Sequence, residues 1–350
     1  MLRLCVDSRD TLRDPRGIGR YVREVLRRFA AMDDVNLQLL TGSAFPLVMR
    51  KPYRTLLEGG RFTLRRSMPR AADVSWHPWN GIFFEGSAPA AVTVHDVVPF
   101  AYPDPDARKR ASQQAPFLRA RGALAVLTDS RFSAGEIETH LGIPARRINV
   151  VPLGVDGTFS PGPPAPPPSL RGLRYILVLA TTEPHKNLAT LLEGFSSADL
   201  PDDVVLAVRG GASKSTQRIV ALDALDEEGL RGLYRGALVV AMPSVYEGFG
   251  LPALEAMACG APVLASRAGA LPEVCGEAAA YVDEPRSSSA WAVALTELVR
   301  DERRRDELCA RGMLRAASFT WDATASATLS VLRACAREGA TRETASVARN

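Results

Sequence analysis

One segment constrains the fold of this chain more than any other: residues 242–266, which read MPSVYEGFGLPALEAMACGAPVLAS. Pro252 suits the first turn of a helix, because the N–H that proline lacks has no partner there. Gly260 suits the end of that helix after little more than two turns, and the apolar residues 262–265 then predict a buried strand. The segment therefore predicts a loop, a short helix and a strand in succession.

Two carboxylates stand at defined places in this segment. Glu247 falls in the predicted loop and Glu255 in the predicted helix, with the E-x7-E spacing. Gly248 and Gly250 allow the backbone to approach a ligand closely, and the start of the helix offers N–H donors to an anion. We therefore predict a pocket with one acid in the loop and one in the helix. The alternative is a strand, turn and helix whose glutamates are merely solvated.

A second motif, TTEPHKN at residues 181–187, lies between a predicted strand and a predicted helix. At such a junction Lys186 can place its ammonium group on phosphate oxygens, while the helix N-terminus adds N–H donors. Nearly all of the 43 basic residues of the chain are arginines, so a lysine here departs from its general composition. A compact ammonium group suits a crowded diphosphate, and a surface lysine without function is the alternative.

Two shorter motifs lie in the first half of the chain. RGIGRY at residues 16–21 joins a polar loop to the first predicted helix. Its glycines match half of a dinucleotide-binding loop, but Val22 occupies the place of the third small residue, so NAD binding is not predicted. VHD at residues 94–96 ends a predicted strand. A histidine at the end of a strand, taken alone, is more often structural than functional.

Strand-like and helix-like segments alternate along the chain, which predicts α/β architecture. At 350 residues the chain is long enough for two such domains. The proline-rich residues 161–169 can form neither a helix nor a central strand, so they predict a stiff linker. We expect domains at 1–160 and 171–318, a linker at 161–170, and a C-terminal helix at 319–350 that packs back towards the first domain and ends in a disordered tail. Strands are expected at residues 2–6, 91–94, 123–128, 147–152, 175–180, 204–209, 237–242 and 262–265, and helices at 18–29, 188–195 and 319–337.

Composition narrows the class of protein. No apolar run approaches the roughly 18 residues that span a bilayer, and the charged start is unlike a signal peptide. The five cysteines are scattered, which indicates a reducing compartment and predicts no zinc site. We therefore expect a cytoplasmic protein. Residues 1–160 are basic while the remainder is slightly acidic, which favours an acidic partner of the first half, such as a phosphorylated acceptor or the inner membrane face. A solvated arginine-rich surface is an equal alternative, and no aromatic residues are interleaved as in a nucleic-acid groove.

Together these motifs resemble the family 4 glycosyltransferases, retaining enzymes of the GT-B fold. The resemblance rests on E-x7-E with its G-F-G-L-P core, T-x-E-P-x-K-N, V-H-D-x-x-P and G-I-G-R-Y. It is closest to bacterial mannosyl- and rhamnosyltransferases of surface polysaccharides. It implies two Rossmann-like α/β/α domains that face each other across a cleft, with the acceptor bound by the first domain and the nucleotide sugar by the second.

The resemblance also implies roles for individual residues. Lys186 is expected to stabilise the leaving nucleoside diphosphate, Glu247 to contact the transferred sugar, and His95 to lie beside that sugar as the third catalytic candidate. Glu255 is expected to hold the ribose. The other donor-site candidates are Thr181, His185, Gly248, Phe249, Gly250 and Leu251, with Asp223, Ala224 and Leu225 at the base; the acceptor-side candidates are Gly17, Ile18, Gly19, Arg20, Asp96 and His77.

The expected activity is retaining transfer of a hexosyl group, mannose-type, from a nucleotide sugar to a hydroxyl of a saccharide, lipid-linked or small-molecule acceptor. No metal, other cofactor or nucleic acid is expected. The alternatives are a sugar phosphorylase or nucleotide-sugar epimerase of the same fold, or a non-catalytic binder of sugar nucleotides. A binder is suggested by two departures from the family pattern: the short connection 210–218, where a helix is usual, and Asp223, where glycine is usual. Asp104-Pro105-Asp106 is interpreted as a turn rather than as a metal-binding D-x-D motif.

Overall fold

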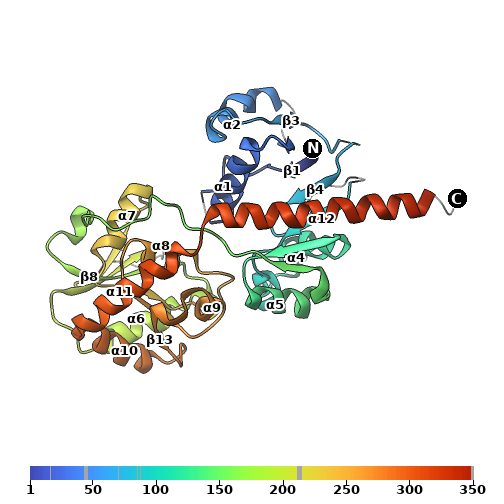
Figure 1. Cartoon of the computed structure of the whole chain (residues 1–350). Coiled ribbons are helices and arrows are strands. Elements are labelled where there is room, and N and C mark those ends of the chain that lie inside the picture. The colour runs from blue at the N-terminus through green and yellow to red at the C-terminus, as the bar shows by residue number, and fades with distance from the viewer. Residues whose placement is uncertain are drawn as a thin grey trace. The chain divides into compact units, whose positions relative to one another are not determined.

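A computed structural model shows two compact units, each built on a parallel β-sheet (Figure 1). Unit 1 comprises Met1–Gly154 together with Trp321–Asn350, and unit 2 comprises Val155–Thr320. The C-terminal helix therefore groups with the first unit. The structure describes residues 1–15, 17–42, 46–69, 71–84, 86, 88–210 and 215–347.

Unit 1 contains a seven-stranded parallel sheet of order β3-β2-β1-β4-β5-β6-β7. Chain order runs outward from β1 in one direction and from β4 in the other, so the topological switch point lies between these two strands. The central strands are buried on both faces, as parallel sheets require. The strands are β1 (Leu2–Asp7), β2 (Val35–Leu40), β3 (Thr63–Arg65), β4 (Val74–His77), β5 (Ala90–Thr93), β6 (Ala125–Thr128) and β7 (Ile148–Val150).

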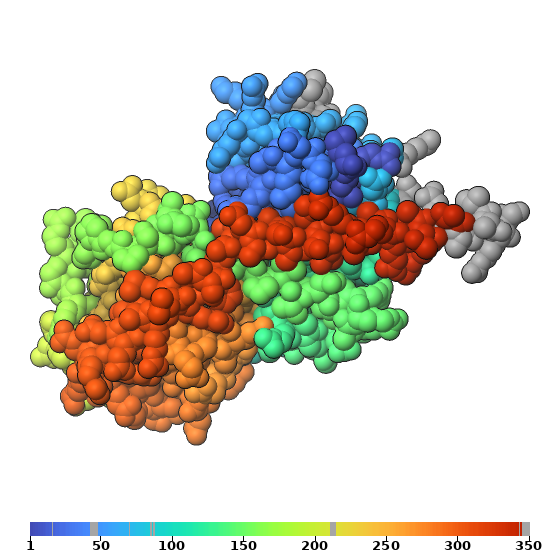
Figure 2. Space-filling view, viewed as in Figure 1, coloured from blue at the N-terminus to red at the C-terminus, as the bar shows by residue number. Residues whose placement is uncertain are grey.

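Helices cover this sheet. Helix α1 (Gly17–Ala31) buries an apolar stripe with helical spacing that includes Val22, Leu26 and Phe29. The long helix α12 (Trp321–Val347) packs against α1, β4, β5 and β6, and Figure 2 shows it in red across the surface of unit 1. The others are α2 (Arg50–Leu56), α3 (Val98–Ala101), α4 (Ala107–Arg119) and α5 (Arg131–Leu141), with 3₁₀ turns at Pro46–Met49, Ala120–Gly122 and Ala145–Arg147.

Unit 2 contains a six-stranded parallel sheet of order β10-β9-β8-β11-β12-β13, whose switch point lies between β8 and β11. Its core is formed where α6 crosses α10: a Cβ on Gly194 would lie 2.6 Å from the Cβ of the fully buried Trp291, so only glycine allows this approach. The strands are β8 (Arg174–Leu179), β9 (Val204–Arg209), β10 (Ile219–Leu222), β11 (Val239–Met242), β12 (Val263–Ser266) and β13 (Ala279–Val282). The helices are α6 (Leu188–Ser197), α7 (Glu227–Gly236), α8 (Leu251–Ala258), α9 (Leu271–Cys275), α10 (Ser288–Arg300) and α11 (Glu302–Ala317), with 3₁₀ turns at Pro168–Leu170, Pro184–Lys186 and Gly276–Ala278.

The proline-rich segment is not a free linker between the units. Both boundaries between them, Gly154/Val155 and Thr320/Trp321, lie outside it. The segment packs on α7, where a Cβ on Gly232 would lie 2.7 Å from the Cβ of Ala165, and Arg235 Nε donates a hydrogen bond of 2.8 Å to the Ser160 carbonyl. The predicted linker at 161–170 is therefore corrected: its prolines form an extended strip that covers α7 within unit 2.

Two other expectations change. Helix α12 continues to Val347, ten residues past its predicted end and into the expected disordered tail; residues 348–350 lie outside the described part of the chain. The short connection does join two parallel strands, because β9 pairs with β10 through Leu206 and Ile219. Nine extended residues can reach about 30 Å, enough to return along so short a strand without a crossover helix. Gly211–Lys214 of this connection lie outside the described residues.

Candidate functional site

The principal candidate site lies in unit 2, at the carboxyl ends of β8 and β11. These strands flank the switch point of the six-stranded sheet, which is where ligands bind in open parallel α/β sheets. The TTEPHKN turn follows β8, and the loop that contains Glu247 follows β11. The fold therefore brings together two motifs that are about 60 residues apart in the sequence.

Hydrogen bonds of the Asn187 side chain hold the TTEPHKN turn against neighbouring loops. Its backbone has the left-handed conformation with φ 54°, which asparagine tolerates better than most residues. Its Nδ2 donates hydrogen bonds to the carbonyls of Pro243 (3.1 Å) and Pro285 (2.6 Å), and its Oδ1 accepts one from Thr190 Oγ1 (2.7 Å). These bonds fix the position of the neighbouring Lys186 relative to the β11 loop.

Lys186 and Glu247 form an ion pair. Nζ of Lys186 donates to Oε2 of Glu247 over 2.9 Å, and the two side chains are 27% and 15% exposed. The pair is thus sheltered but open to a ligand. A cation that can hold phosphate oxygens and an acid that can hold sugar hydroxyls lie in direct contact.

Two glycines shape the backbone around Glu247. Gly250 has φ 99°, and a Cβ there would lie 2.8 Å from Leu271 Cδ2. A Cβ on Gly269 would lie 2.7 Å from the Glu247 nitrogen, and the Ala270 N–H donates to the Glu247 carbonyl (2.9 Å). Sequence reasoning found Gly250 but missed Gly269, because the glycine acts through a contact with a segment 22 residues away.

Glu255 lies in α8 and is only 5% exposed. Its Oε2 accepts a hydrogen bond of 3.1 Å from the hydroxyl of Tyr234, a fully buried residue of α7. Gly250 stands at the N-cap of α8, and Pro252 lies in its first turn, as predicted. Pro252 has no N–H, and the Ala253 and Leu254 N–H groups donate to the Gly250 carbonyl (3.0 and 3.3 Å), so an anion at this end would meet the N–H of Leu251 and those of the loop before it. Sequence reasoning missed Tyr234, because nothing in the spacing of this tyrosine links it to Glu255.

The other donor-site candidates divide into two groups. Those near the ion pair follow β8 or β11: Thr181 is exposed, His185 is buried and accepts from the Val245 N–H through its carbonyl (2.9 Å), and Phe249 packs edge-on to Phe319. Gly248 lies in this loop, and Leu251 begins α8. The predicted base turn, Asp223, Ala224 and Leu225, follows β10, two strands from β8. Asp223 and Ala224 are exposed, and the Leu225 carbonyl accepts a hydrogen bond from Arg209 Nη2 (3.4 Å).

His95 in unit 1 lies in a different environment from the one expected. It is buried, its Nδ1 lies 2.7 Å from Asp129 Oδ2, and its Nε2 lies 3.2 Å from the Pro78 carbonyl. Burial lowers the pKa of His95, but Asp129, together with the Pro78 carbonyl and Asp96, outweighs burial and raises that pKa overall. Because both ring nitrogens are engaged within unit 1, a hydrogen bond from His95 to a sugar hydroxyl would have to displace the Pro78 carbonyl. Asp129 precedes Ser130, whose side chain caps α5 by accepting a hydrogen bond from the Ser133 N–H (3.0 Å).

His77 is corrected from an acceptor-side residue to an interior one. It is 1% exposed, and burial, with the charge of Arg9, lowers its pKa to about 4. The flanking indoles also face inward: Trp76 Nε1 donates to Thr93 Oγ1 (2.9 Å) and Trp79 Nε1 to the Asp7 carbonyl (2.8 Å). Their rings are used in the core of unit 1 and do not form a stacking surface for a sugar.

The remaining acceptor-side candidates lie near the start of α1 and after β5. Gly17, Ile18, Gly19 and Arg20 form the first turn of α1. A Cβ on Gly19 would collide with the Asp14 carbonyl, so this glycine is needed for local packing. Asp96 Oδ1 accepts from the Val98 N–H (3.1 Å) at the start of α3. Arg16, the first residue of this motif, lies outside the described residues.

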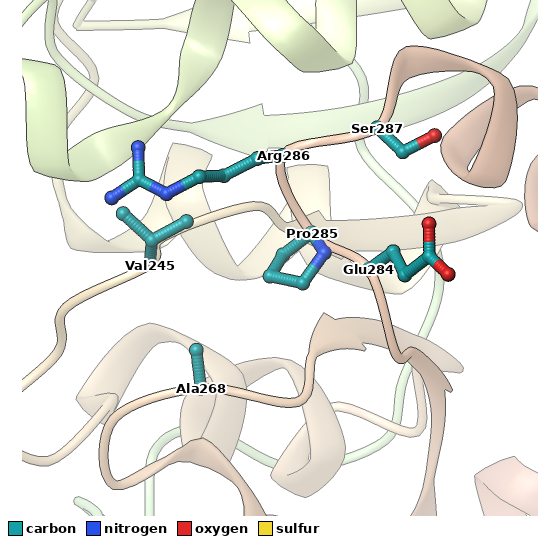
Figure 3. A pocket seen from close by; sticks show the side chains of 6 residues that line it. All are labelled: Val245, Ala268, Glu284, Pro285, Arg286 and Ser287. Carbon is teal, nitrogen blue, oxygen red and sulfur yellow. The ribbon is translucent and has the colours of Figure 1, made fainter.

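A cavity of about 500 Å³ lies beside the Glu247 loop at the carboxyl ends of β11, β12 and β13 (Figure 3). The side chain of Arg286 extends towards Val245, whereas the carboxylate of Glu284 points the other way. Ser287, on the same rim, caps α10 by accepting from the Ala290 N–H (3.2 Å). The cavity thus shares Val245 with the loop that carries Glu247, but its lining includes neither Lys186 nor Glu247.

The described residues contain no cluster of three or more histidine, cysteine or acidic side chains arranged to hold a metal ion. The D-x-D sequence is a helix start: Asp106 accepts hydrogen bonds from Arg108 and Lys109 N–H groups at the N-cap of α4. In the same described part of the chain, no helix is both long and apolar enough to cross a membrane.

Two parallel α/β units, with a cation and two acids at the switch point of the second, define a GT-B glycosyltransferase. Residues 167–313 match the family model described as glycosyl transferases group 1. O-antigen chain mannosyltransferase B of Escherichia coli is 30% identical over 356 aligned residues, which cover 87% of this chain and 93% of that protein. The chain therefore belongs to the group 1 glycosyltransferases.

Other comparisons agree. The MMP alpha-(1->4)-mannosyltransferase of Mycolicibacterium hassiacum is 33% identical over 241 residues, 64% of this chain and 55% of that protein. Anabaena HepE, solved with UDP and glucose, superposes with a TM-score of 0.70 at 14% identity, covering 95% of this chain and all of HepE. WaaG, a glycosyltransferase of lipopolysaccharide biosynthesis, gives 0.62 at 12% identity over 95% of this chain and 99% of WaaG. These last two likenesses establish the GT-B fold.

Proposed function

We propose that this glycosyltransferase transfers a mannose-type hexosyl group, with retention, from a nucleotide sugar to a hydroxyl of a saccharide, lipid-linked or small-molecule acceptor. The observation that carries the proposal is the contact of Lys186 with Glu247, 2.9 Å apart at the switch point of unit 2, next to the helix that holds Glu255. This arrangement supplies one group for each part of a nucleotide sugar: a cation for the diphosphate and separate acids for the hexose and the ribose.

Electrostatic stabilisation of the departing diphosphate is the main chemical task of such a site. The Lys186 ammonium group contacts Glu247, and the backbone N–H groups that follow Glu247 lead into the start of α8. Fixed donors of this kind stabilise charge that develops on the leaving group and need no reorganisation during the reaction. Because Lys186 supplies positive charge at the diphosphate, we propose that turnover needs no divalent cation.

Retention of the anomeric configuration follows because neither candidate general base, Glu247 or His95, is available to deprotonate the acceptor. A reaction on the opposite face needs a general base aimed at the acceptor hydroxyl. Glu247 is expected to be engaged with hydroxyls of the donor hexose, and both ring nitrogens of His95 are engaged within unit 1. A same-face reaction needs only an acceptor hydroxyl next to the departing diphosphate, whose oxygens can take its proton. We therefore infer that the anomeric configuration of the donor is kept.

The donor class is inferred from the relatives. Two of them are named mannosyltransferases, and HepE was solved with UDP and glucose. A thermal-shift series with GDP-mannose, UDP-glucose, GDP and UDP tests the proposal, because a ligand at 100 times its Kd raises stability by about 2.7 kcal/mol. We expect one nucleotide sugar and its diphosphate to raise the melting temperature in the wild type and much less in Glu255→Ala. No shift with any of them would contradict a nucleotide-sugar site.

Peripheral contact with an anionic membrane is part of the proposal. Helix α2 exposes Arg50, Lys51 and Arg54, and α4 exposes Arg108 and Lys109 without any acidic residue in either helix. Each basic residue near an anionic surface contributes about 1 kcal/mol. Two short basic helices on unit 1 therefore suit a lipid-linked acceptor that is presented at a membrane surface.

A further inference from the structure

Tyr234 is the one polar side chain of α7 that is fully buried and aimed at a predicted substrate-binding group. It lies in the last turn of the helix, and its hydroxyl donates to Glu255 Oε2 over 3.1 Å. Glu255 itself is 5% exposed, so this hydrogen bond is shielded from water. A charge-assisted bond in such surroundings is stronger than one at the surface.

The position of Tyr234 is set by rigid packing. Its ring lies edge-on to Phe159, with centroids 6.2 Å apart. Helix α7 is capped by Asp226, which accepts from the Gly229 N–H (2.8 Å), and its far side is covered by the proline-rich strip. The hydroxyl is therefore delivered to one fixed point. A glutamate held by such a donor loses the freedom of its own side-chain torsions before any ligand arrives.

We propose that Tyr234 is a positioning residue for the nucleotide ribose: its hydroxyl holds the Glu255 carboxylate in the orientation that accepts hydrogen bonds from ribose hydroxyls. This inference rests on the proposed role of Glu255 in nucleotide binding. Because Tyr234 is fully buried and its hydroxyl donates to Glu255, we expect its effect on binding to pass through Glu255. Its removal should weaken binding only when the ribose hydroxyls are present.

The chain provides a matched control in Tyr175. This tyrosine of β8 is 1% exposed, and its hydroxyl donates to the Leu233 carbonyl of the same helix α7 over 2.6 Å. Tyr175→Phe thus removes a buried hydroxyl that holds α7, one residue away from Tyr234, without touching Glu255. Any loss that comes merely from loosening α7 should appear in both variants.

The test is isothermal titration calorimetry of the full-length wild type, Tyr234→Phe, Tyr175→Phe and Glu255→Ala with GDP and UDP and with their 2′,3′-dideoxy counterparts. Melting temperatures without nucleotide establish that each variant is folded. We expect Tyr234→Phe to weaken binding of the preferred ribonucleotide by about three- to tenfold, the usual loss for one hydrogen bond. The dideoxynucleotide should bind wild type and Tyr234→Phe equally, and Tyr175→Phe should match the wild type with both.

The outcomes distinguish failure of the positioning role of Tyr234 from failure of the proposed ribose-binding role of Glu255. If Glu255→Ala binds the ribonucleotide as well as the wild type does, the proposed role of Glu255 in ribose binding is wrong, and so is the positioning role of Tyr234. If Glu255→Ala weakens binding but Tyr234→Phe does not, only the positioning role is wrong. Equal losses of Tyr234→Phe with the ribonucleotide and the dideoxynucleotide, or equal losses in Tyr175→Phe, would show that Tyr234 merely supports the packing of α7.

Discussion

Glu247→Gln should have opposite effects on binding and on catalysis. Without nucleotide, the carboxylate of Glu247 holds Lys186 at 2.9 Å. Two unit charges at that distance attract each other by about 6 kcal/mol at an effective dielectric constant of 20, and a charge-assisted hydrogen bond contributes about 1.5–3 kcal/mol net of solvation. The substitution keeps the shape of the side chain but removes its charge, so the ammonium group loses its competing partner.

The diphosphate should therefore bind the variant more tightly. Release of about half of that net energy gives about 0.8–1.5 kcal/mol, or a roughly four- to twelvefold lower Kd for the preferred nucleoside diphosphate, measured by titration calorimetry. The rate of sugar transfer should fall, because the acid expected to hold the hexose is lost. Glu183→Gln is the control, since this exposed carboxylate lies in the same turn, three residues from Lys186. Unchanged or weaker diphosphate binding in Glu247→Gln, or an equal gain in Glu183→Gln, would refute the reasoning.

Three further predictions concern the leaving group, the fold and the membrane. Lys186→Met should lower kcat more than donor affinity, because charge on the diphosphate grows towards the transition state, while a chelator should leave wild-type turnover intact; activity lost in chelator and restored by magnesium would contradict this. His77 titrates near pH 4 when folded and near its ordinary 6.5 when unfolded, so stability is full above pH 6.5 and falls by about 3 kcal/mol towards pH 4. Urea unfolding should show that His77→Gln loses less stability than the wild type over this range, and parallel losses would be evidence against the assignment. Sedimentation with vesicles should show binding to phosphatidylserine-containing but not to pure phosphatidylcholine membranes, weakened in Lys51→Glu; binding independent of lipid charge would exclude an electrostatic contact.

Local signals in the sequence predicted much of the fold. Pro252 and Gly260 bracket a helix that the structure places at Leu251–Ala258, and the apolar run after it forms β12. Helix α1 was found through its apolar stripe, within two residues at either end. These elements carry their own start, stop and burial signals. Strand β4 (Val74–His77) was missed. Its four residues, which include Trp76 and precede Pro78 and Trp79, show neither an alternating nor a long apolar pattern.

The parts that could not be predicted depend on pairs distant in the sequence. Lys186 and Glu247 were each found through their own motif, but their ion pair depends on β8 lying beside β11. The bond of Tyr234 to Glu255 and that of His95 to Asp129 link neighbouring elements whose register no local pattern specifies. The prediction that the proline-rich segment is a linker was wrong, because its packing on the glycines of α7 is a tertiary contact that no local pattern indicates.

The stereochemistry of transfer tests the central claim most directly, because it depends on which group takes the acceptor proton. Full-length enzyme is incubated with the α-linked nucleotide sugar that stabilises it most, and the fresh product is read by NMR from its anomeric coupling before mutarotation. With Lys186 and the backbone N–H groups after Glu247 holding the diphosphate, Glu247 holding the hexose and His95 engaged within unit 1, the account predicts an α-configured product. A β-configured product would require a general base on the opposite face and would contradict both the proposed mechanism and the role of Glu247.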